Sequence, residues 1–157
     1  MIKEYLEKSI AVKNAALSDQ NFLDNADKAG RQIHDSLMAG KRIYIAGVGG
    51  AAAEAQHFSA ELLGKYKSMR KAYPAVALTT DSSMLTAWAN DASFDFIFSR
   101  QLEGLGQKGD IFVALSAGGN SPSIVEALKV ANSLGMISIC LLGKGGGQAK
   151  DLCTIPV

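Results

Sequence analysis

The chain has 157 residues, of which 48% are hydrophobic, and it carries a formal net charge of +1. This length suits one domain with its own core, and the near-neutral charge gives no electrostatic reason to expect nucleic acid or an anionic membrane as a partner. No apolar run approaches the roughly 20 residues that span a bilayer, and the charged, amphipathic N-terminus is unlike a secretory signal. The two cysteines are too few for a disulfide framework and lack the spacing of a zinc site, so we expect reduced thiols in a cytoplasmic protein.

Residues 1–40 predict two helices arranged as an N-terminal hairpin. Apolar residues recur at helical spacing from Tyr5 to Val12, the polar segment 18–21 offers a cap for a second helix, and Gly40 suits the position just after its end. No strand precedes these helices, so we expect an arm that packs on the same domain or on a neighbouring subunit. His34 falls within this arm and is assigned a surface or packing role.

The stretch 42–66 predicts a strand, a glycine turn and a helix in direct succession. β-Branched, aromatic and small apolar residues dominate 42–46, as in a buried parallel strand, and helix formers dominate from Ala51. The glycines between them, at 47, 49 and 50, permit a tight turn and leave the backbone amides at the helix start open to an anion such as phosphate. Further along this helix, His57 and Glu61 stand four residues apart and therefore share one face.

The rest of the chain alternates further strands with helices. We predict strands at 75–80, 110–115, 136–142 and 153–157, and helices at 82–90, about 94–105, from Pro122 onward, and briefly after 147. This alternation predicts an α/β fold, a parallel sheet covered by helices on both faces in a three-layer α/β/α arrangement. A last strand of this kind normally leads into one more helix, so we expect a shortened chain in which part of the sheet is exposed unless another subunit or segment covers it.

Two glycine-rich loops follow strands, at 47–51 and 116–121. In parallel sheets, ligands bind beyond the carboxyl ends of the strands, so both loops are candidates for a phosphate site. The first loop also fits the dinucleotide pattern G-x-G-x-x-A, but the acidic residue expected about 20 positions later is missing, since Asp81 lies 34 positions after Gly47. We therefore expect no nucleotide cofactor.

Three segments together resemble the sugar isomerase (SIS) family, and within it the phosphoheptose isomerases. They are AGVGGAAAEAQHFSAELLGKY, LTTDSSMLTAWANDASFDFIFSRQL and GDIFVALSAGGNSPSIVEAL, and the resemblance covers nearly the whole chain. It implies a five-stranded sheet of flavodoxin-like order in a SIS domain at 41–157, and interconversion of sedoheptulose 7-phosphate with D-glycero-D-manno-heptose 7-phosphate for the heptose of lipopolysaccharide. It also implies a homotetramer with sites at subunit contacts.

The resemblance assigns roles to particular residues. Glu61 would be the general base, and His57 with Glu61 would be two ligands of a zinc ion found in some members, in a site completed by an absent C-terminal segment. Sugar contacts would come from Val48, Gly49, Gly50, Glu61, Asn90 and Asp91. Phosphate contacts would come from Ser116, Ala117, Gly118 and Ser121.

Four positions depart from the family pattern. The first loop usually reads G-N-G-G-S, where this chain has Val48 and Ala51, and the second usually reads S-T-S-G-N-S, where this chain has Ala117 and Gly118. Each replacement removes a hydrogen-bonding side chain worth roughly 1 kcal/mol, so we expect weaker phosphate binding through the remaining backbone amides. The family's final helix, which supplies a histidine as general acid and further metal ligands, has no counterpart in the sequence. The sequence therefore leaves open whether this form of the chain is catalytically active.

Other functions remain open from the sequence. Glu61 could be an exposed helix residue paired with Lys65 at i+4, and His57 could be a packing histidine. The chain could then be a non-catalytic SIS module that binds a sugar phosphate or a protein partner, or a purely structural oligomer subunit. Retention of Glu61 favours the isomerase, whereas the missing loop hydroxyls favour the alternatives.

Overall fold

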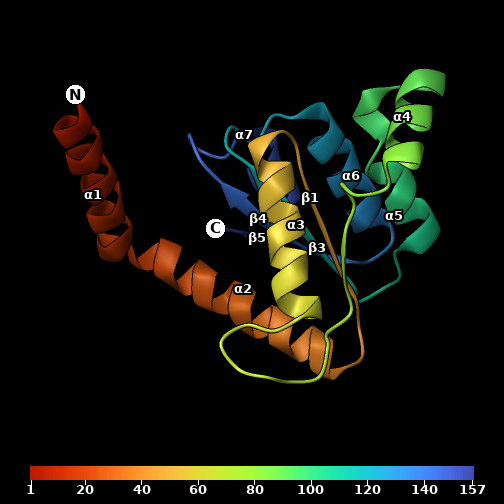
Figure 1. Ribbon diagram of the computed structural model, residues 1–157, viewed down its shortest axis with the longest axis horizontal. Helices are drawn as coiled ribbons and strands as arrows, with labels where there is room; N and C mark the ends of the chain where they lie inside the picture. Colours follow the sequence, from red (N-terminus) through yellow and green to blue (C-terminus); the bar gives the residue numbers. More distant parts are fainter.

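A computed structural model describes all residues, 1–157. Its centre is a five-stranded sheet of β1 (Ile43–Gly47), β2 (Ala75–Ala77), β3 (Ile111–Ser116), β4 (Ile137–Leu142) and β5 (Ile155–Pro156). All pairings are parallel and the strand order is β2-β1-β3-β4-β5 (Figure 1). The order reverses at β1, whose neighbours are β2 and β3. The predicted parallel sheet of flavodoxin-like order is confirmed.

Helices cover both faces of the sheet. On one face, α2 (Gln20–Met38) and α3 (Gly50–Leu63) pack on side chains such as Ile45, Val113 and Ile139. On the other, α5 (Ser99–Leu105), α6 (Pro122–Ser133) and α7 (Gly147–Leu152) pack around Phe112, with α4 (Ser82–Asp91) and the short 3-10 helix η1 (Phe94–Phe96) outside them. These two apolar layers confirm the three-layer α/β/α fold.

The N-terminal arm consists of two helices, as predicted, but they do not form a hairpin. α1 (Ile2–Ser18) and α2 meet at Asp19, whose carboxylate caps α2 by accepting a hydrogen bond from the amide of Phe22 at 3.1 Å. α2 lies along the domain and buries Ala29 and Leu37, whereas α1 turns away and buries no residue (Figure 1). The predicted hairpin is wrong because a single residue, Asp19, separates the two helices, and helices that fold back on each other need a loop of about two to five residues.

Several element boundaries differ from the sequence predictions. β2 ends at Ala77 rather than residue 80, because the chain turns there and the Thr80 hydroxyl donates to the Ala77 carbonyl at 3.0 Å. The helix predicted at 94–105 is divided into η1 and α5. β5 begins at Ile155, because Cys153 still closes α7. His34 is exposed beside Asp35, which confirms its surface role. No helix has the length and apolar character that crossing a bilayer demands.

Candidate functional site

The first glycine loop joins β1 to α3 through a turn that only glycine permits at its start. A Cβ on Gly47 would lie 2.5 Å from the carbonyl oxygen of Ala51, closer than real side chains approach. Gly49 then adopts a positive φ of 65° as the residue before α3, and no side chain caps the helix. The first amides of α3 are therefore left open at the carboxyl end of β1.

The second loop connects β3 to α6 and is held in shape by its own hydrogen bonds. The Ser116 hydroxyl accepts from the amide of Gly119 at 3.1 Å, so its own proton is free to be donated outward. Ser121 precedes α6 without capping it, since its hydroxyl pairs instead with the Ser123 hydroxyl at 3.2 Å. Pro122 has no N–H, and the amides of Ile124 and Val125 donate to the Ser121 carbonyl, so Ser123 has the one amide of the first turn of α6 that remains open. Two hydroxyls and this amide are suitable donors for phosphate.

One open cleft of about 1060 Å³ brings the two loops together. Val48, Gly50 and Ala51 line it from the first loop, and Ser116, Ala117 and Ser121 line it from the second. Both loops therefore face one space, while Gly49 and Gly118 lie outside its lining, and the roles of these residues in ligand binding stay predictions. The remaining wall is largely apolar and includes Leu141, which is 40% exposed.

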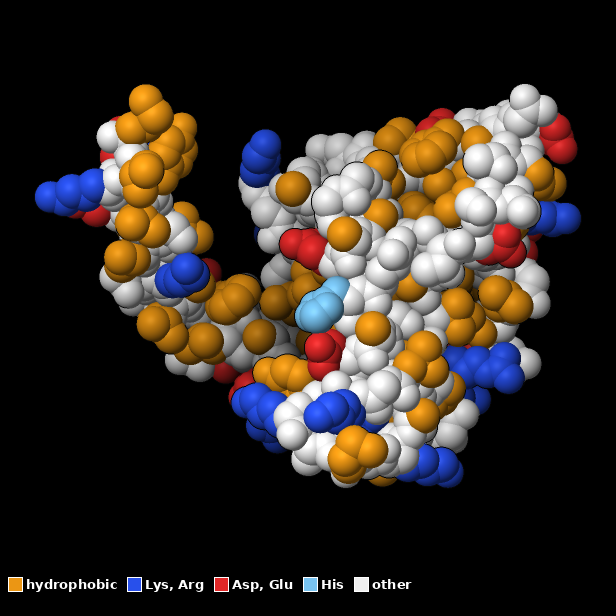
Figure 2. Space-filling model, viewed as in Figure 1, with side chains coloured by type: hydrophobic (Ala, Val, Ile, Leu, Met, Phe, Trp, Pro, Cys, Tyr) orange, Lys and Arg blue, Asp and Glu red, His pale blue; other side chains and the backbone are white.

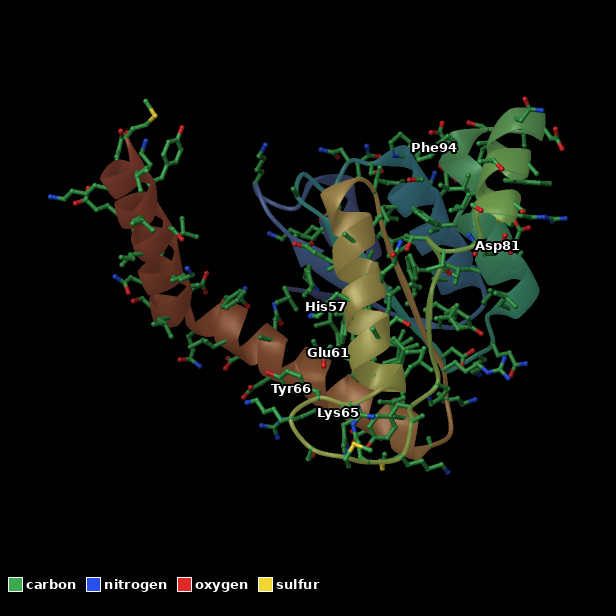
Figure 3. All side chains as sticks on the ribbon, in the orientation of Figure 1. His57, Glu61, Lys65, Tyr66, Asp81 and Phe94 are labelled. Atoms are coloured by element: carbon green, nitrogen blue, oxygen red, sulfur yellow. The ribbon has the colours of Figure 1, made fainter.

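His57 and Glu61 project from the same face of α3 (Figure 3). The imidazole Nε2 lies 3.6 Å from Glu61 Oε1, and the two side chains are 76% and 35% exposed. Glu61 therefore has His57 as its neighbour, and no ion pair with Lys65 forms. The space-filling view shows a histidine at the surface of this face with acidic side chains gathered around it (Figure 2).

A second cleft, of about 780 Å³, contains this pair. His57 and Glu61 line it together with Tyr66, Arg70 and Tyr73 from the segment that follows α3. Glu61 comes eleven residues after Gly50, so at about 1.5 Å per residue it lies about 16 Å along the helix from the first loop. Within one chain, the candidate base therefore does not contact the first glycine loop.

Glu54 and Phe58 line both clefts and connect them. Glu54 is exposed and makes no ion pair or side-chain hydrogen bond. Our sequence analysis did not select it, although it stands three residues before His57 and seven before Glu61. That spacing places all three side chains on one helix face and was the signal that could have identified it.

Two predicted contacts lie elsewhere. Asn90 and Asp91 end α4 and line neither cleft, and the Asn90 amide donates to the Asp91 carboxylate at 2.9 Å. Their role as sugar contacts stays a prediction.

The residues of this chain do not form a complete zinc site. His57 and Glu61 are the only predicted ligands, and no group of three histidine, cysteine, aspartate or glutamate side chains is arranged to hold a metal ion. Zinc in proteins usually takes three or four protein ligands, so this pair does not suffice.

Comparisons with known proteins agree with this geometry. The family model described as SIS domain matches residues 4–143. A phosphoheptose isomerase of Campylobacter concisus is 44% identical over 99% of this chain and 82% of its own length. This chain belongs to the phosphoheptose isomerase family. Solved structures support the assignment: the phosphoheptose isomerase of Neisseria gonorrhoeae has a TM-score of 0.91 at 36% identity, over 99% of this chain and 82% of that one. That of Francisella tularensis has a TM-score of 0.90 at 30% identity.

Proposed function

We propose that the chain is an aldose–ketose isomerase that interconverts sedoheptulose 7-phosphate and D-glycero-D-manno-heptose 7-phosphate. Membership of the phosphoheptose isomerase family supports this activity. The observation that carries it is that both glycine loops line one cleft, which Glu54 and Phe58 connect to the cleft that contains Glu61 and His57.

In a heptulose 7-phosphate the carbonyl is at C2 and the phosphate is on C7, and even the extended molecule is shorter than the distance of about 16 Å between the first loop and Glu61 along α3. In this proposal a neighbouring copy of the chain therefore brings its Glu61 to the phosphate loop, as sites at subunit contacts would require. Glu54 and Phe58 line both clefts, where the carboxylate of Glu54 can accept hydrogen bonds from the sugar hydroxyls.

The second loop holds the phosphate in this proposal. Ser116 and Ser121 offer hydroxyls, and the first turn of α6 offers the Ser123 amide at the positive end of the helix dipole. Ala117 and Gly118 contribute only backbone, so the affinity is expected to be lower than for a loop with four hydroxyl-bearing or amide side chains.

Glu61 acts as the general base. Its carboxylate removes a proton from C1 of the ketose, the electron pair forms the C1–C2 double bond, and O2 takes up a proton to give the enediol. Loss of the O1 proton then forms the aldehyde while C2 receives a proton, so atoms and charge balance. His57, 3.6 Å from Glu61, is placed to carry a proton between the two oxygens.

Zinc, a homotetramer and a cytoplasmic location complete the proposal. Zinc binding at His57 and Glu61 requires at least one further ligand from another segment or subunit. Assembly is supported by α1, which exposes large apolar side chains such as Leu6 and Ile10 while burying none. Two free cysteines suit the reducing cytoplasm.

Turnover of a series of ketose phosphates tests this function. We expect activity with sedoheptulose 7-phosphate, a marked drop in kcat/KM with fructose 6-phosphate and ribulose 5-phosphate, and loss of at least 100-fold in kcat in Glu61→Gln. The variant should keep the thermal shift that the substrate produces, since it still binds. A chain that shows that shift but no turnover would instead be the non-catalytic SIS module.

A further inference from the structure

The carboxamide of Asn120 joins the second glycine loop to α7. Its Oδ1 accepts a hydrogen bond from the amide of Gln148 at 3.0 Å, and its Nδ2 donates to the Gly118 carbonyl at 3.1 Å. A backbone amide can only donate and a carbonyl can only accept, so the two partners fix which end of the carboxamide faces which. Asn120 is therefore held in one orientation although it lies at the surface.

The peptide unit between Gly118 and Gly119 is held at both of its ends. Its carbonyl accepts from Asn120, and its N–H donates to the hydroxyl oxygen of Ser116 at 3.1 Å. The C=O and N–H of a trans peptide point in opposite directions, so both bonds stabilise the same orientation. Without Asn120 this unit could turn over readily, because it is flanked by two glycines and Gly118 has open space around it.

The orientation of this peptide decides what the Ser116 hydroxyl can do. With the N–H directed at its oxygen, Ser116 accepts, and its own proton remains for a phosphate in the cleft that it lines. With the peptide turned over, the Gly118 carbonyl would face Ser116 instead, and the hydroxyl would donate to that carbonyl. A phosphate would then lose one of the two hydroxyls that this loop offers.

α7 holds the other side of the loop. The amide of Ala149 donates to the Gly119 carbonyl at 2.9 Å, and Gly119 packs so closely on Gly146 that a Cβ there would overlap its carbonyl. A Cβ on Gly147 would lie 2.6 Å from Asn120 Oδ1. Asn120 is the side chain of the loop that hydrogen-bonds to α7, and it transmits the position of that helix to the loop.

We propose that Asn120 is a positioning residue of the phosphate site, which holds the peptide between Gly118 and Gly119 so that Ser116 donates to the phosphate. The proposal rests on the proposed isomerase, because it concerns the phosphate of that substrate. Asn120 itself lines neither cleft, so it acts through Ser116 rather than by touching the sugar phosphate.

Binding of inorganic phosphate tests this role without any turnover. By calorimetric titration, Asn120→Ala should have a Kd about threefold to tenfold above that of the parent, as expected for the loss of one hydrogen bond. Asn132→Ala is the matched control: the exposed Asn132 also ties α6 to α7, through the Leu152 carbonyl at 2.8 Å, but at the far end of α7. It should keep the parent Kd even if both variants lose similar unfolding free energy. Equal Kd values for the two variants would overturn the proposal.

A double-mutant cycle tests the route through Ser116. In a Ser116→Ala background, Asn120→Ala should change the Kd for phosphate by less than about twofold, because the hydroxyl that Asn120 positions is already gone. Two residues that act independently would instead multiply their effects. Full multiplication would refute the positioning role and leave Asn120 as a structural residue only.

Turnover separates this role from the isomerase itself. In Asn120→Ala we expect KM for sedoheptulose 7-phosphate to rise by the same factor as the Kd, with kcat within about twofold of the parent. If the parent shows no turnover but the Kd values behave as expected, the isomerase fails and the positioning role stands. If the parent turns over and Asn120→Ala keeps its Kd, the isomerase stands and the positioning role fails. A parent that binds no phosphate would also overturn the role of Asn120.

Discussion

The guanidinium of Arg70 donates to the main-chain carbonyl of Glu61, the candidate base. It donates to the Leu62 carbonyl as well, at 2.8 Å, and lies over the Tyr73 ring at 4.5 Å from its centroid. The last carbonyls of a helix lack partners within it, so Arg70 satisfies the end of α3 from a segment that returns to it. One side chain thereby stabilises the helix and fixes the position of Glu61.

Arg70→Ala should therefore lower both stability and activity. Loss of charge-assisted hydrogen bonds to two partly buried carbonyls is expected to reduce the free energy of unfolding by about 1–3 kcal/mol, measured by denaturant titration. We expect kcat to fall more than KM rises, because the phosphate loop is untouched. Lys71→Ala, which removes an exposed neighbouring cation, is the control and should behave as the parent does. Equal unfolding free energies and equal kcat for Arg70→Ala and Lys71→Ala would contradict the role of Arg70.

Ser116→Ala and Ser121→Ala should each weaken phosphate binding. A hydrogen bond to a charged group is worth about 1.5–3 kcal/mol, so we expect KM to rise roughly tenfold or more with little change in kcat. The inhibition constant of inorganic phosphate, used as a competitor, should rise by the same factor. Ser133→Ala, at the far end of α6, provides the control. The assignment of the second loop would not survive if these variants kept the parent KM.

Gly118→Ser should strengthen phosphate binding. A Cβ at Gly118 meets no atom within 4 Å, so the backbone accepts the serine that related loops have. One added donor near the phosphate is expected to lower KM several-fold, measured in the same assay. Gly118→Ala adds the Cβ without the hydroxyl and should leave KM unchanged. An improvement in Gly118→Ala as well would mean that the gain comes from loop rigidity.

Gly119→Ala, one position later, should be strongly destabilising. Gly119 has a positive φ of 64° and packs directly on Gly146, so a methyl group can be placed only by moving the two loops apart. We expect a loss of about 1–3 kcal/mol in unfolding free energy, together with weaker phosphate binding. Chemical denaturation measures this loss, with Gly118→Ala as the control. Similar denaturation midpoints for the two variants would contradict the close packing of Gly119 on Gly146.

Substitutions on α1 should change the oligomeric state. Leu6 and Ile10 are exposed on α1, and we expect Leu6→Glu with Ile10→Glu to dissociate the assembly to a smaller species. Light scattering coupled to size exclusion gives the mass, and circular dichroism checks that helix content is retained. Asn14→Glu, on the same helix but polar already, should leave the mass unchanged. A parent chain that is itself monomeric would remove the basis for this prediction.

The sequence alone determined the alternation of strands and helices, the strand order through family resemblance, both glycine loops and the pair His57 and Glu61. These features are local: buried strands are short apolar runs, turns require glycine, and residues four apart on a helix share a face.

Only the tertiary structure decided how distant segments meet. It turned α1 away from α2, brought Arg70 back to the end of α3 and made Glu54 part of both clefts. Such contacts depend on how whole layers pack, and no periodicity within a single segment records that packing.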